Sequence, residues 1–281
     1  MRVFPLIGLA VAGLAAGALE AMAVMRIDRD LPVRDLDPRL HGLRIAHVSD
    51  LHLGAPGVNS MAAWRALELL DEAAPDLIAV TGDQLSHARG AEELLELLSS
   101  FHAPLGTVAI LGNHDLGYVR DPFSKAGPVP DYASAGVTLL RDETIVVEHA
   151  GARIAISGIE PRQQEKRQVL PPHGQPLQAP WPESDAEFHI VLSHYPDLFD
   201  VLPAGSRDLV LAGHLHGGQV CIPWPSGRIR LSQINHAYTD GIFTRGDATM
   251  HVSRGVGTTF VPVRYFARPE ITILRLVPAA G

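Results

Sequence analysis

Apolar runs typical of buried strands alternate with amphipathic helical patterns in the first part of the chain. The runs at 43–49, 76–82 and 106–112 each lead into a polar side chain. Between them, 60–73 and 91–101 repeat apolar residues with the 3.6-residue period of a helix. This βαβαβ order predicts a parallel sheet with helices packed on its faces.

The second half of the chain is richer in strands and poorer in helices. Strand-like runs are expected at 144–149, 153–159, 188–194, 208–214, 248–255 and 270–276. Because few helices separate them, they predict a second, more antiparallel sheet packed on the first. The polar, proline-rich stretch 160–184 is expected to be a surface loop.

The N-terminal region has a different composition. No charged residue occurs from Val3 to Leu19, and after Glu20 the apolar character continues as far as Met25. Since about 20 apolar residues suffice to span a bilayer, residues 1–25 are expected to anchor the protein in the inner (cytoplasmic) membrane. The A-x-A-like sequence at 21–23 leaves a cleaved signal peptide open, and a buried soluble helix is the third alternative.

The chain is expected to divide after this region. Residues 26–42 alternate Arg and Asp around Pro32 and Pro38 and are interpreted as an extended, solvated linker, which leaves 43–281 as the catalytic domain. Arginines flank the apolar segment on both sides, so the side of the membrane that the domain faces stays open.

Composition argues against a nucleic-acid partner and against a cysteine-rich metal site. The net charge of −8, without any block of Lys and Arg, argues against nucleic acid as a partner. The lone cysteine, Cys221, excludes a thiolate-rich zinc site, so any metal is held by nitrogen and oxygen ligands. No obligate protein partner is inferred.

Five predicted strands end in side chains that can bind a metal. They are Asp50 and His52 in "SDLH", Asp83 in "TGD", Asn113 and His114 in "GNHD", His194 in "SHYPD", and His214 and His216 in "GHLH". Ligands of an open α/β sheet bind at the carboxyl ends of its strands, so these groups are expected to meet at one edge. The adjacent Gly82, Gly112 and Gly213 suit tight turns and close backbone approach.

The donor set indicates two metal ions. Imidazole together with carboxylate and carboxamide oxygen suits Mn, Fe or Zn better than Mg or Ca. Seven ligands are too many for one tetrahedral site but suit two ions that share a carboxylate, and Asp83 is the natural bridge. The nine histidines outside the motifs, His47 and His251 among them, are expected to be structural or on the surface.

The ordered motifs resemble those of the calcineurin-like metallophosphoesterases, DxH, GD, GNH(D/E), H and GHxH, over about residues 43–276. The runs "SDLHLG", "GHLHGGQV" and "SRGVGT" are similar to the YkuE/YaeI-like subgroup of bacterial enzymes. Leu215 and Tyr195 replace the Thr and Asn expected there, and neither position supplies a ligand. The resemblance implies an α/β fold, a sandwich of two mixed β-sheets flanked by helices. An N-terminal transmembrane or signal helix is expected to precede it in the sequence.

The resemblance also implies a role for each motif residue. One metal would be held by Asp50, His52, Asp83 and His216, and the other by Asp83, Asn113, His194 and His214. An extended 214–216 would point both imidazoles the same way and turn Leu215 to the core. His114 would protonate the leaving oxygen or stabilise charge on the phosphoryl group, while Asp115 orients its ring and raises its pKa. Arg254 is expected to contact phosphate, with a salt bridge as an equal alternative.

The activity implied is hydrolysis of a phosphodiester, phosphomonoester or pyrophosphate by in-line attack of a metal-bridging hydroxide. The subgroup and its neighbours imply a small-molecule or lipid-linked substrate related to the membrane or envelope, such as UDP-2,3-diacylglucosamine of lipid A synthesis or another phospholipid or wall phosphoester. The alternative is a non-catalytic metal-binding scaffold of the same fold. The presence of every motif position counts against that alternative.

Overall fold

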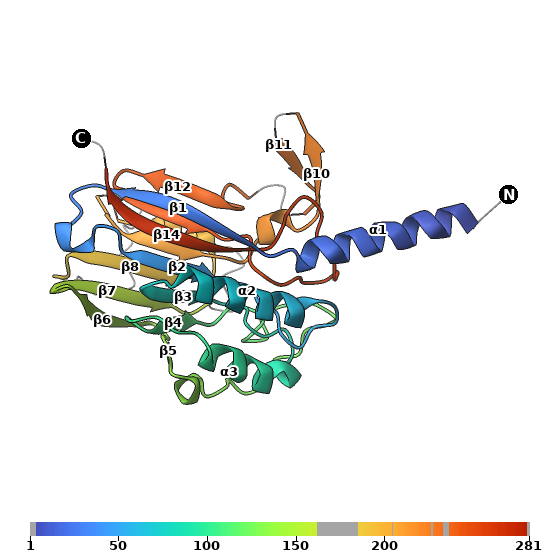
Figure 1. The fold of residues 1–281 in the computed structure, drawn as a ribbon, viewed down its shortest axis with the longest axis horizontal. Coiled ribbons are helices and arrows are strands. Elements are labelled where there is room, and N and C mark those ends of the chain that lie inside the picture. The colour runs from blue at the N-terminus through green and yellow to red at the C-terminus, as the bar shows by residue number, and fades with distance from the viewer. Residues whose placement is uncertain (1–3, 162–184, 204, 226, 233–235, 280–281) are drawn as a thin grey trace.

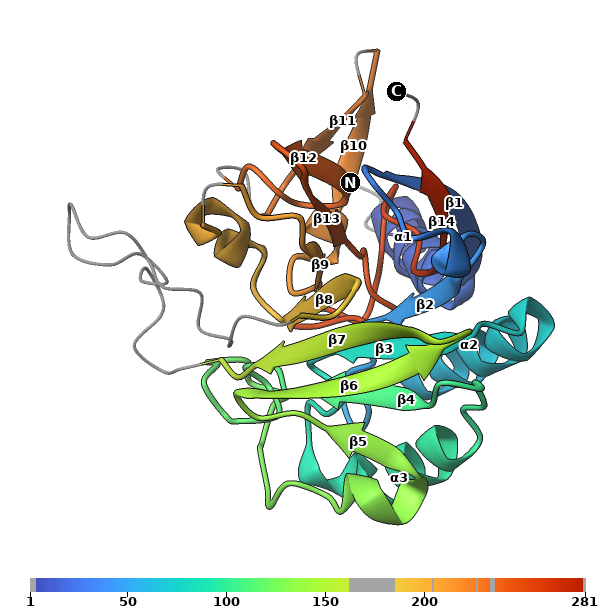
Figure 2. The same cartoon turned by 90° about the vertical axis from the view of Figure 1, so that its left-hand side faces the viewer.

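Two six-stranded sheets pack face to face in the computed structural model, which describes residues 4–161, 185–203, 205–225, 227–232 and 236–279 (Figure 1). Helices α2 (Asn59–Ala73) and α3 (Ala91–Ser99) lie against the outer face of the first sheet. Figure 2 shows these helices on one side of the first sheet, with β8 and β9 of the second sheet on the other. The expected α/β fold with two mixed sheets is confirmed.

The first sheet has the order β1-β14-β2-β3-β4-β5. Its strands are β1 (Met25–Val33), β2 (Arg44–Val48), β3 (Leu77–Thr81), β4 (Thr107–Ile110), β5 (Val137–Leu139) and β14 (Glu270–Pro278). Strands β2 to β5 run parallel, as the βαβαβ pattern predicts, and β14 is antiparallel to β2. Strands β2, β3 and β4 are almost wholly buried, because both of their faces are covered.

The second sheet has the order β12-β13-β9-β8-β7-β6. Its strands are β6 (Glu143–His149), β7 (Ala152–Ile159), β8 (Phe188–Ser193), β9 (Leu209–Ala212), β12 (Gly241–Arg245) and β13 (Ala248–Val252). Only the two outer pairs are antiparallel, and the centre β13-β9-β8-β7 is parallel. The second sheet is more antiparallel than the first, as expected from sequence, with two antiparallel pairs against one. Its centre is nevertheless parallel, because the connections between these strands cross over rather than turn back.

Apolar side chains fill the space between the sheets. Ile45 and Ile110 of the first sheet and Ile156, Ile190 and Leu211 of the second are fully buried there. A second apolar layer joins the first sheet to α2 and α3, and a third lies on the far side of the second sheet. The two sheets are thus held rigidly enough to place side chains at their shared carboxyl edge.

The segment 26–42, expected to be a solvated linker, instead contributes an edge strand. Strand β1 pairs in parallel with β14, from Met25 opposite Glu270 to Val33 opposite Pro278. Its alternating charges face outward, where Asp30 accepts hydrogen bonds of 2.7 Å from Arg275, while Leu31 is 1% exposed. Pro32 is compatible with an edge strand, which leaves one side without ladder bonds.

Helix α1 (Phe4–Met22) extends away from the two sheets (Figure 1). It is held near its C-terminal end, where Gly17 O accepts a hydrogen bond of 3.0 Å from Arg264 N and Gly13 O accepts one of 2.6 Å from the Tyr265 hydroxyl. Among the described residues, no helix combines the length and the apolar character needed to cross a bilayer. The loop predicted at 160–184 falls almost wholly outside the described residues.

We expect Leu31→Ala to lower the free energy of unfolding by about 2–4 kcal/mol, because the substitution leaves a cavity beneath an edge strand that belongs to the core. Urea denaturation measures this change. Leu19→Ala is the matched control, since Leu19 is 67% exposed. Equal losses for the two variants would show that β1 does not pack on the domain in solution.

Candidate metal centre

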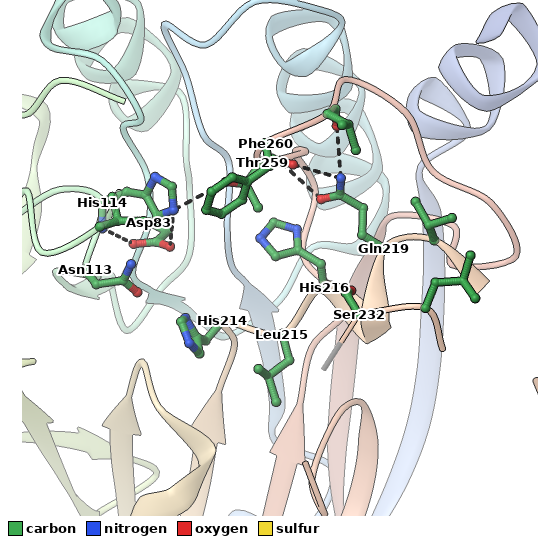
Figure 3. A pocket seen from close by; sticks show the side chains of 14 residues that line it. Asp83, Asn113, His114, His214, Leu215, His216, Gln219, Ser232, Thr259 and Phe260 are labelled. Carbon is green, nitrogen blue, oxygen red and sulfur yellow. Dashed lines mark hydrogen bonds and ion pairs between the residues drawn. The ribbon is translucent and has the colours of Figure 1, made fainter. Parts of the chain in front are cut away.

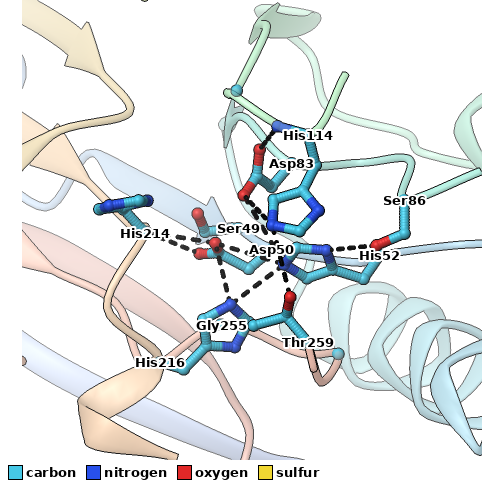
Figure 4. Close-up of polar contacts among 12 residues, drawn as sticks. Ser49, Asp50, His52, Asp83, Ser86, His114, His214, His216, Gly255 and Thr259 are labelled. Carbon is cyan, nitrogen blue, oxygen red and sulfur yellow. Dashed lines mark hydrogen bonds and ion pairs between the residues drawn. The ribbon is translucent and has the colours of Figure 1, made fainter. Parts of the chain in front are cut away.

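The seven predicted metal ligands meet at the carboxyl ends of β2, β3, β4, β8 and β9. Figures 3 and 4 label all of them except His194. Six of them are at most 4% exposed, and His214 is half-buried. They come from five loops that are far apart in the sequence, so the parallel register of the strands is what brings them together. The expected convergence at one edge is therefore observed.

The donor atoms form two adjacent clusters. In the first, His52 Nε2 lies 3.0 Å from His216 Nε2, and Asp50 Oδ1 lies 3.8 Å and 3.5 Å from these two nitrogens. In the second, His194 Nε2 lies 3.0 Å from Asn113 Oδ1 and 3.2 Å from His214 Nδ1.

Asp83 lies between the two clusters. Its Oδ2 is 3.2 Å from His194 Nε2 and 3.7 Å from His52 Nε2. The groups Asp50–His52–His216 and Asp83–His194–His214 each place their ligand atoms within 4.8 Å of one another. Imidazole nitrogens and carboxylate oxygens directed at a common point are a suitable donor set for divalent cations.

Hydrogen bonds behind the imidazoles fix their orientation. His52 Nδ1 bonds Ser86 Oγ at 2.8 Å, and His194 Nδ1 donates to Thr81 O at 2.9 Å. Each bond leaves Nε2 facing its cluster, which is how outer contacts commonly orient metal-binding histidines.

Charges within the clusters shift the pKa values strongly. Burial opposes ionisation of Asp83, but His194 and His114 hold the pKa of its carboxyl well below the usual value. Burial lowers the pKa of His194, yet Asp83 and Asp50 outweigh burial and raise it to about 9. For His214, burial and then His194 lower the pKa to about 3. The carboxylates therefore stabilise positive charge inside the centre, where a cation would bind.

Five of the seven predicted ligands have left-handed backbone conformations. The φ angles are 55° at Asp50, 50° at His52, 54° at Asp83, 77° at His214 and 50° at His216. Each costs on the order of 1–2 kcal/mol for a residue other than glycine. Such strain is typical of functional sites that the surrounding structure holds in place.

The GHLH segment is consequently not extended, contrary to the sequence expectation. Leu215 has φ −98° and ψ −2°, between two left-handed histidines, and a 3₁₀ turn follows at His216–Gly218. Leu215 is nevertheless buried, and the imidazoles of His214 and His216 enter the two different clusters. The prediction that an extended 214–216 would point both imidazoles the same way was wrong, because the chain turns sharply at these residues.

His114 lies beside Asp83, with its Nε2 3.9 Å from Asp83 Oδ2 (Figure 4). Its Nε2 is also 3.3 Å from Thr259 Oγ1, and its Nδ1 is 3.2 Å from Ser124 Oγ. Burial lowers its pKa to about 4, although Asp83 acts in the opposite direction. The expected rise in the pKa of His114 is therefore not found.

Asp115 does not have the role expected for it. Its carboxylate accepts backbone hydrogen bonds of 2.7 Å from both Gly112 N and Leu85 N. Burial and then Asp83 raise its pKa to about 7. Asp115 thus connects the GNHD loop to the loop after β3. Its carboxylate does not bond the ring of His114, which contacts Ser124 and Thr259 instead.

Arg254 is also placed differently from the first expectation. Its backbone N–H and its Nε donate to the buried Glu270, at 3.1 Å and 2.6 Å. It is not among the residues that line the cavity beside the clusters. The salt-bridge alternative is the one that the structure shows.

A cavity of about 370 Å³ opens beside the clusters (Figure 3). Asp83, Asn113, His114, His214 and His216 form the polar part of its wall next to the clusters, and Gln219, Ser232 and Thr259 add further polar side chains. The apolar part of its wall consists of Val119, Leu215, Val220, Leu231, Phe260 and Val261.

Three polar residues of the cavity, Gln219, Ser232 and Thr259, escaped the sequence analysis. The Thr259 hydroxyl donates to Asp121 Oδ2 at 2.8 Å, and Gln219 Nε2 donates to Thr259 O and Val261 O, both at 2.9 Å. Gln219 belongs to the GHLHGGQV run and Thr259 directly follows SRGVGT. Those runs were the only signal that these positions belong to the site.

A buried histidine pair supports the centre from behind. The Thr81 hydroxyl donates its hydrogen to Ser49 Oγ, so its oxygen accepts from His47 Nε2–H at 2.8 Å. Because the proton of His47 is then on Nε2, His47 Nδ1 accepts from His251 Nδ1–H at 2.7 Å. A second proton on His47 would face the hydrogen that His251 already donates. Burial, followed by Arg29 and Arg254, lowers the pKa of His251 to about 3.

Glycine is required where the loops approach one another. A Cβ at Gly213 would clash with Ser49 Oγ and Asp50 Oδ2, and a Cβ at Gly112 would clash with Asp83. The expected role of these glycines in close approach is confirmed. The backbone of Gly213 is not left-handed, so the clash alone forbids a side chain there.

We expect Gly213→Ala to weaken binding of Mn²⁺ at least about tenfold, because the new methyl group displaces Asp50 while the fold stays intact. Isothermal titration calorimetry measures the affinity. Gly13→Ala is the control, since the nearest atom to its Cβ is 3.9 Å away. Unchanged affinity in Gly213→Ala would mean that Asp50 does not hold the ion.

We expect the histidine pair to make the protein less stable in acid. His251 has a pKa of about 3 in the folded chain, below the ordinary histidine value of 6.5, so the unfolded chain takes up a proton first as the pH falls. Stability is then lost from about pH 6.5 downward, by up to about 1.4 kcal/mol per pH unit for this group. Urea unfolding at pH 7.5, 6 and 5 should show a smaller loss for His251→Gln, and parallel curves would contradict this account.

Comparison with known proteins agrees with this site. The family model described as calcineurin-like phosphoesterase matches residues 43–218. The chain is 30% identical to the uncharacterized metallophosphoesterase YkuE of Bacillus subtilis, over 84% of the chain and 79% of that protein. It is 26% identical to the UDP-2,3-diacylglucosamine pyrophosphatase LpxG of Chlamydia muridarum (90% and 89%) and 29% identical to the phosphodiesterase YaeI of Escherichia coli (83% and 82%). On the strength of the family match and the clustered motif residues, the chain belongs to the calcineurin-like phosphoesterase family.

Proposed function

We propose that this chain hydrolyses a phosphodiester, phosphomonoester or pyrophosphate with the help of two divalent metal ions. The observation that carries the proposal is the position of Asp83 between two clusters that each complete a set of nitrogen and oxygen donors. Family membership supports the same reaction class.

The two ions would be Mn, Fe or Zn, since imidazole donors predominate. One would be held by Asp50, His52, Asp83 and His216, and the other by Asp83, Asn113, His194 and His214. When bound, such ions supply positive charge that stabilises a phosphoryl transition state and promotes deprotonation of the attacking water. In the overall reaction a P–O bond to water forms in line with the P–O bond to the leaving oxygen, which breaks.

His114 is proposed as the residue that donates to the substrate. The Ser124 hydroxyl already donates to Ser86 O, and the Thr259 hydroxyl donates to Asp121. Both oxygens therefore face the ring of His114 with lone pairs, and they can accept a hydrogen bond from each ring nitrogen. This arrangement stabilises the charged ring against burial, which lowers its pKa to about 4 in the chain alone. A phosphoryl anion in the cavity would favour the same charged form, so His114 can protonate the leaving oxygen or stabilise charge on the phosphoryl group.

The substrate is proposed to be related to the membrane or envelope. Support comes from the apolar wall of the cavity, which extends beyond the space that a phosphoryl group needs, and from the name of the relative LpxG, a UDP-2,3-diacylglucosamine pyrophosphatase. A lipid-linked phosphoester fits both observations. We propose accordingly that the protein works at the inner membrane, with the apolar N-terminal region as its attachment.

We expect the protein reconstituted with Mn²⁺ to hydrolyse bis(4-nitrophenyl) phosphate and to lose this activity with a chelator. His114→Ala should reduce the rate at least about 100-fold while the bound metal stays the same, because only proton donation is removed. Colorimetric assays and metal analysis measure the two quantities. His102→Ala is the matched control on the surface.

Normal turnover in His114→Ala would remove this residue from the mechanism. No turnover by the wild-type chain with Mn²⁺, Fe²⁺ or Zn²⁺ would instead favour the non-catalytic scaffold.

A further inference from the structure

Exposed apolar side chains are concentrated on one part of the described surface. Of its 14 exposed large apolar side chains, ten belong to α1, to the β10–β11 hairpin with the following Leu231, or to the loop 260–266. They are Val11, Leu14, Leu19, Ile222, Trp224, Ile229, Leu231, Phe260, Val261 and Phe266. Patches of this kind mark sites that bind an apolar partner.

The three segments are joined by direct contacts. Strands β10 (Cys221–Trp224) and β11 (Gly227–Arg230) form a separate two-stranded sheet. At its base, Cys221 N donates to Tyr265 O at 2.8 Å and Tyr265 N donates to Gln219 O at 3.0 Å. The Tyr265 hydroxyl donates to Gly13 O of α1. Tyr265 therefore joins the three segments that carry these side chains.

The hairpin has its faces reversed relative to a hairpin exposed to water. Ile222 is the cross-strand partner of Ile229, and Trp224 shares their face, which points outward with exposed fractions of 44–58%. The arginines occupy the opposite face and turn inward, where Arg228 donates to Phe266 O at 2.9 Å and Arg230 donates to Thr239. A water-facing hairpin would show the arginines and hide the isoleucines.

The apolar surface continues into the candidate active site. Leu231, Phe260 and Val261 are each about half exposed, and each also lines the cavity that contains Asp83 and His114. A protein bound over these residues would cover the mouth of the cavity. A lipid leaflet in the same place would supply substrate through it.

We propose that the outward face of the β10–β11 hairpin, with Phe260, Val261 and Phe266, docks on the surface of a lipid bilayer. The substrate's phosphoester then enters the cavity while its acyl chain lies along Leu231, Phe260 and Val261. This second step rests on the function proposed above. Trp224 lies near the tip of the hairpin, and Trp is enriched where apolar and polar surroundings meet. Because the protein carries a net charge of −8, docking depends on apolar burial and needs no anionic lipid.

Fluorescence quenching tests the contact itself. The full chain is mixed with phosphatidylcholine vesicles that contain brominated acyl chains, and the signal of Trp224→Phe is subtracted to isolate Trp224 from the other two tryptophans. We expect the Trp224 signal to be quenched by at least about half, as for a side chain buried at the headgroup–acyl boundary. Vesicle binding without this quenching would assign attachment to α1 alone and overturn the proposal. Hairpin-dependent dimers without quenching would overturn it in favour of a second copy of the chain.

A second assay tests delivery of substrate. The ethyl and hexadecyl diesters of 4-nitrophenyl phosphate share the same leaving group, and the hexadecyl ester is presented in phosphatidylcholine vesicles. Ile222→Ser/Ile229→Ser should reduce turnover of the hexadecyl ester at least about tenfold and leave the ethyl ester unchanged, because two apolar side chains lose their burial in lipid. Val146→Ser, at an exposed position of β6, is the control.

Equal turnover of the hexadecyl ester by wild type and variant would overturn the delivery step. Inactivity of the wild type on both esters would refute the proposed hydrolysis, and the quenching result would still decide the docking.

Discussion

The structure depends on one buried carboxylate, Asp83, at the end of the central strand β3. A carboxylate that is 1% exposed is costly unless cationic or hydrogen-bonding groups surround it. His194, His52 and His114 approach Asp83 from neighbouring strand ends, and His114 N donates to its Oδ1 at 2.8 Å. The register of the parallel strands, the glycines of the loops and the hydrogen bonds behind the imidazoles all serve to keep this charge in place.

The geometry around Asp83 is maintained against local strain. Left-handed conformations at five clustered residues would relax in an isolated loop. Here each loop leaves a strand that is packed on both faces, so the sheets hold the loops in conformations that they would not adopt alone. The cost is offset by the apolar core, and a bound cation would contribute further by neutralising the carboxylates.

Much of this architecture can be predicted from sequence, because its signals are local. Periodicity located β2, α2, β3, α3 and β4, and the polar residues that end the strands identified the residues that converge. The failures have a common cause, since each depends on contacts distant in sequence. Strand β1 resembled a linker because its charges face outward from an edge, and Asp115 pairs with loop backbone rather than with the adjacent His114. The left-handed histidines of GHLH carry no signature in composition.

The connection between α1 and β1 has a mechanical consequence. Only Ala23 and Val24 separate the helix from the strand, and both ends are tied: Glu20 Oε1 accepts from Ala267 N, and Met25 N donates to Pro269 O, each at 2.9 Å. The helix is therefore held in a fixed orientation relative to the sheets and is not joined to them by a flexible linker. If α1 rests on a surface, the metal centre is held at one distance and one orientation relative to that surface. Only phosphoester bonds at that distance from the surface can then enter the centre.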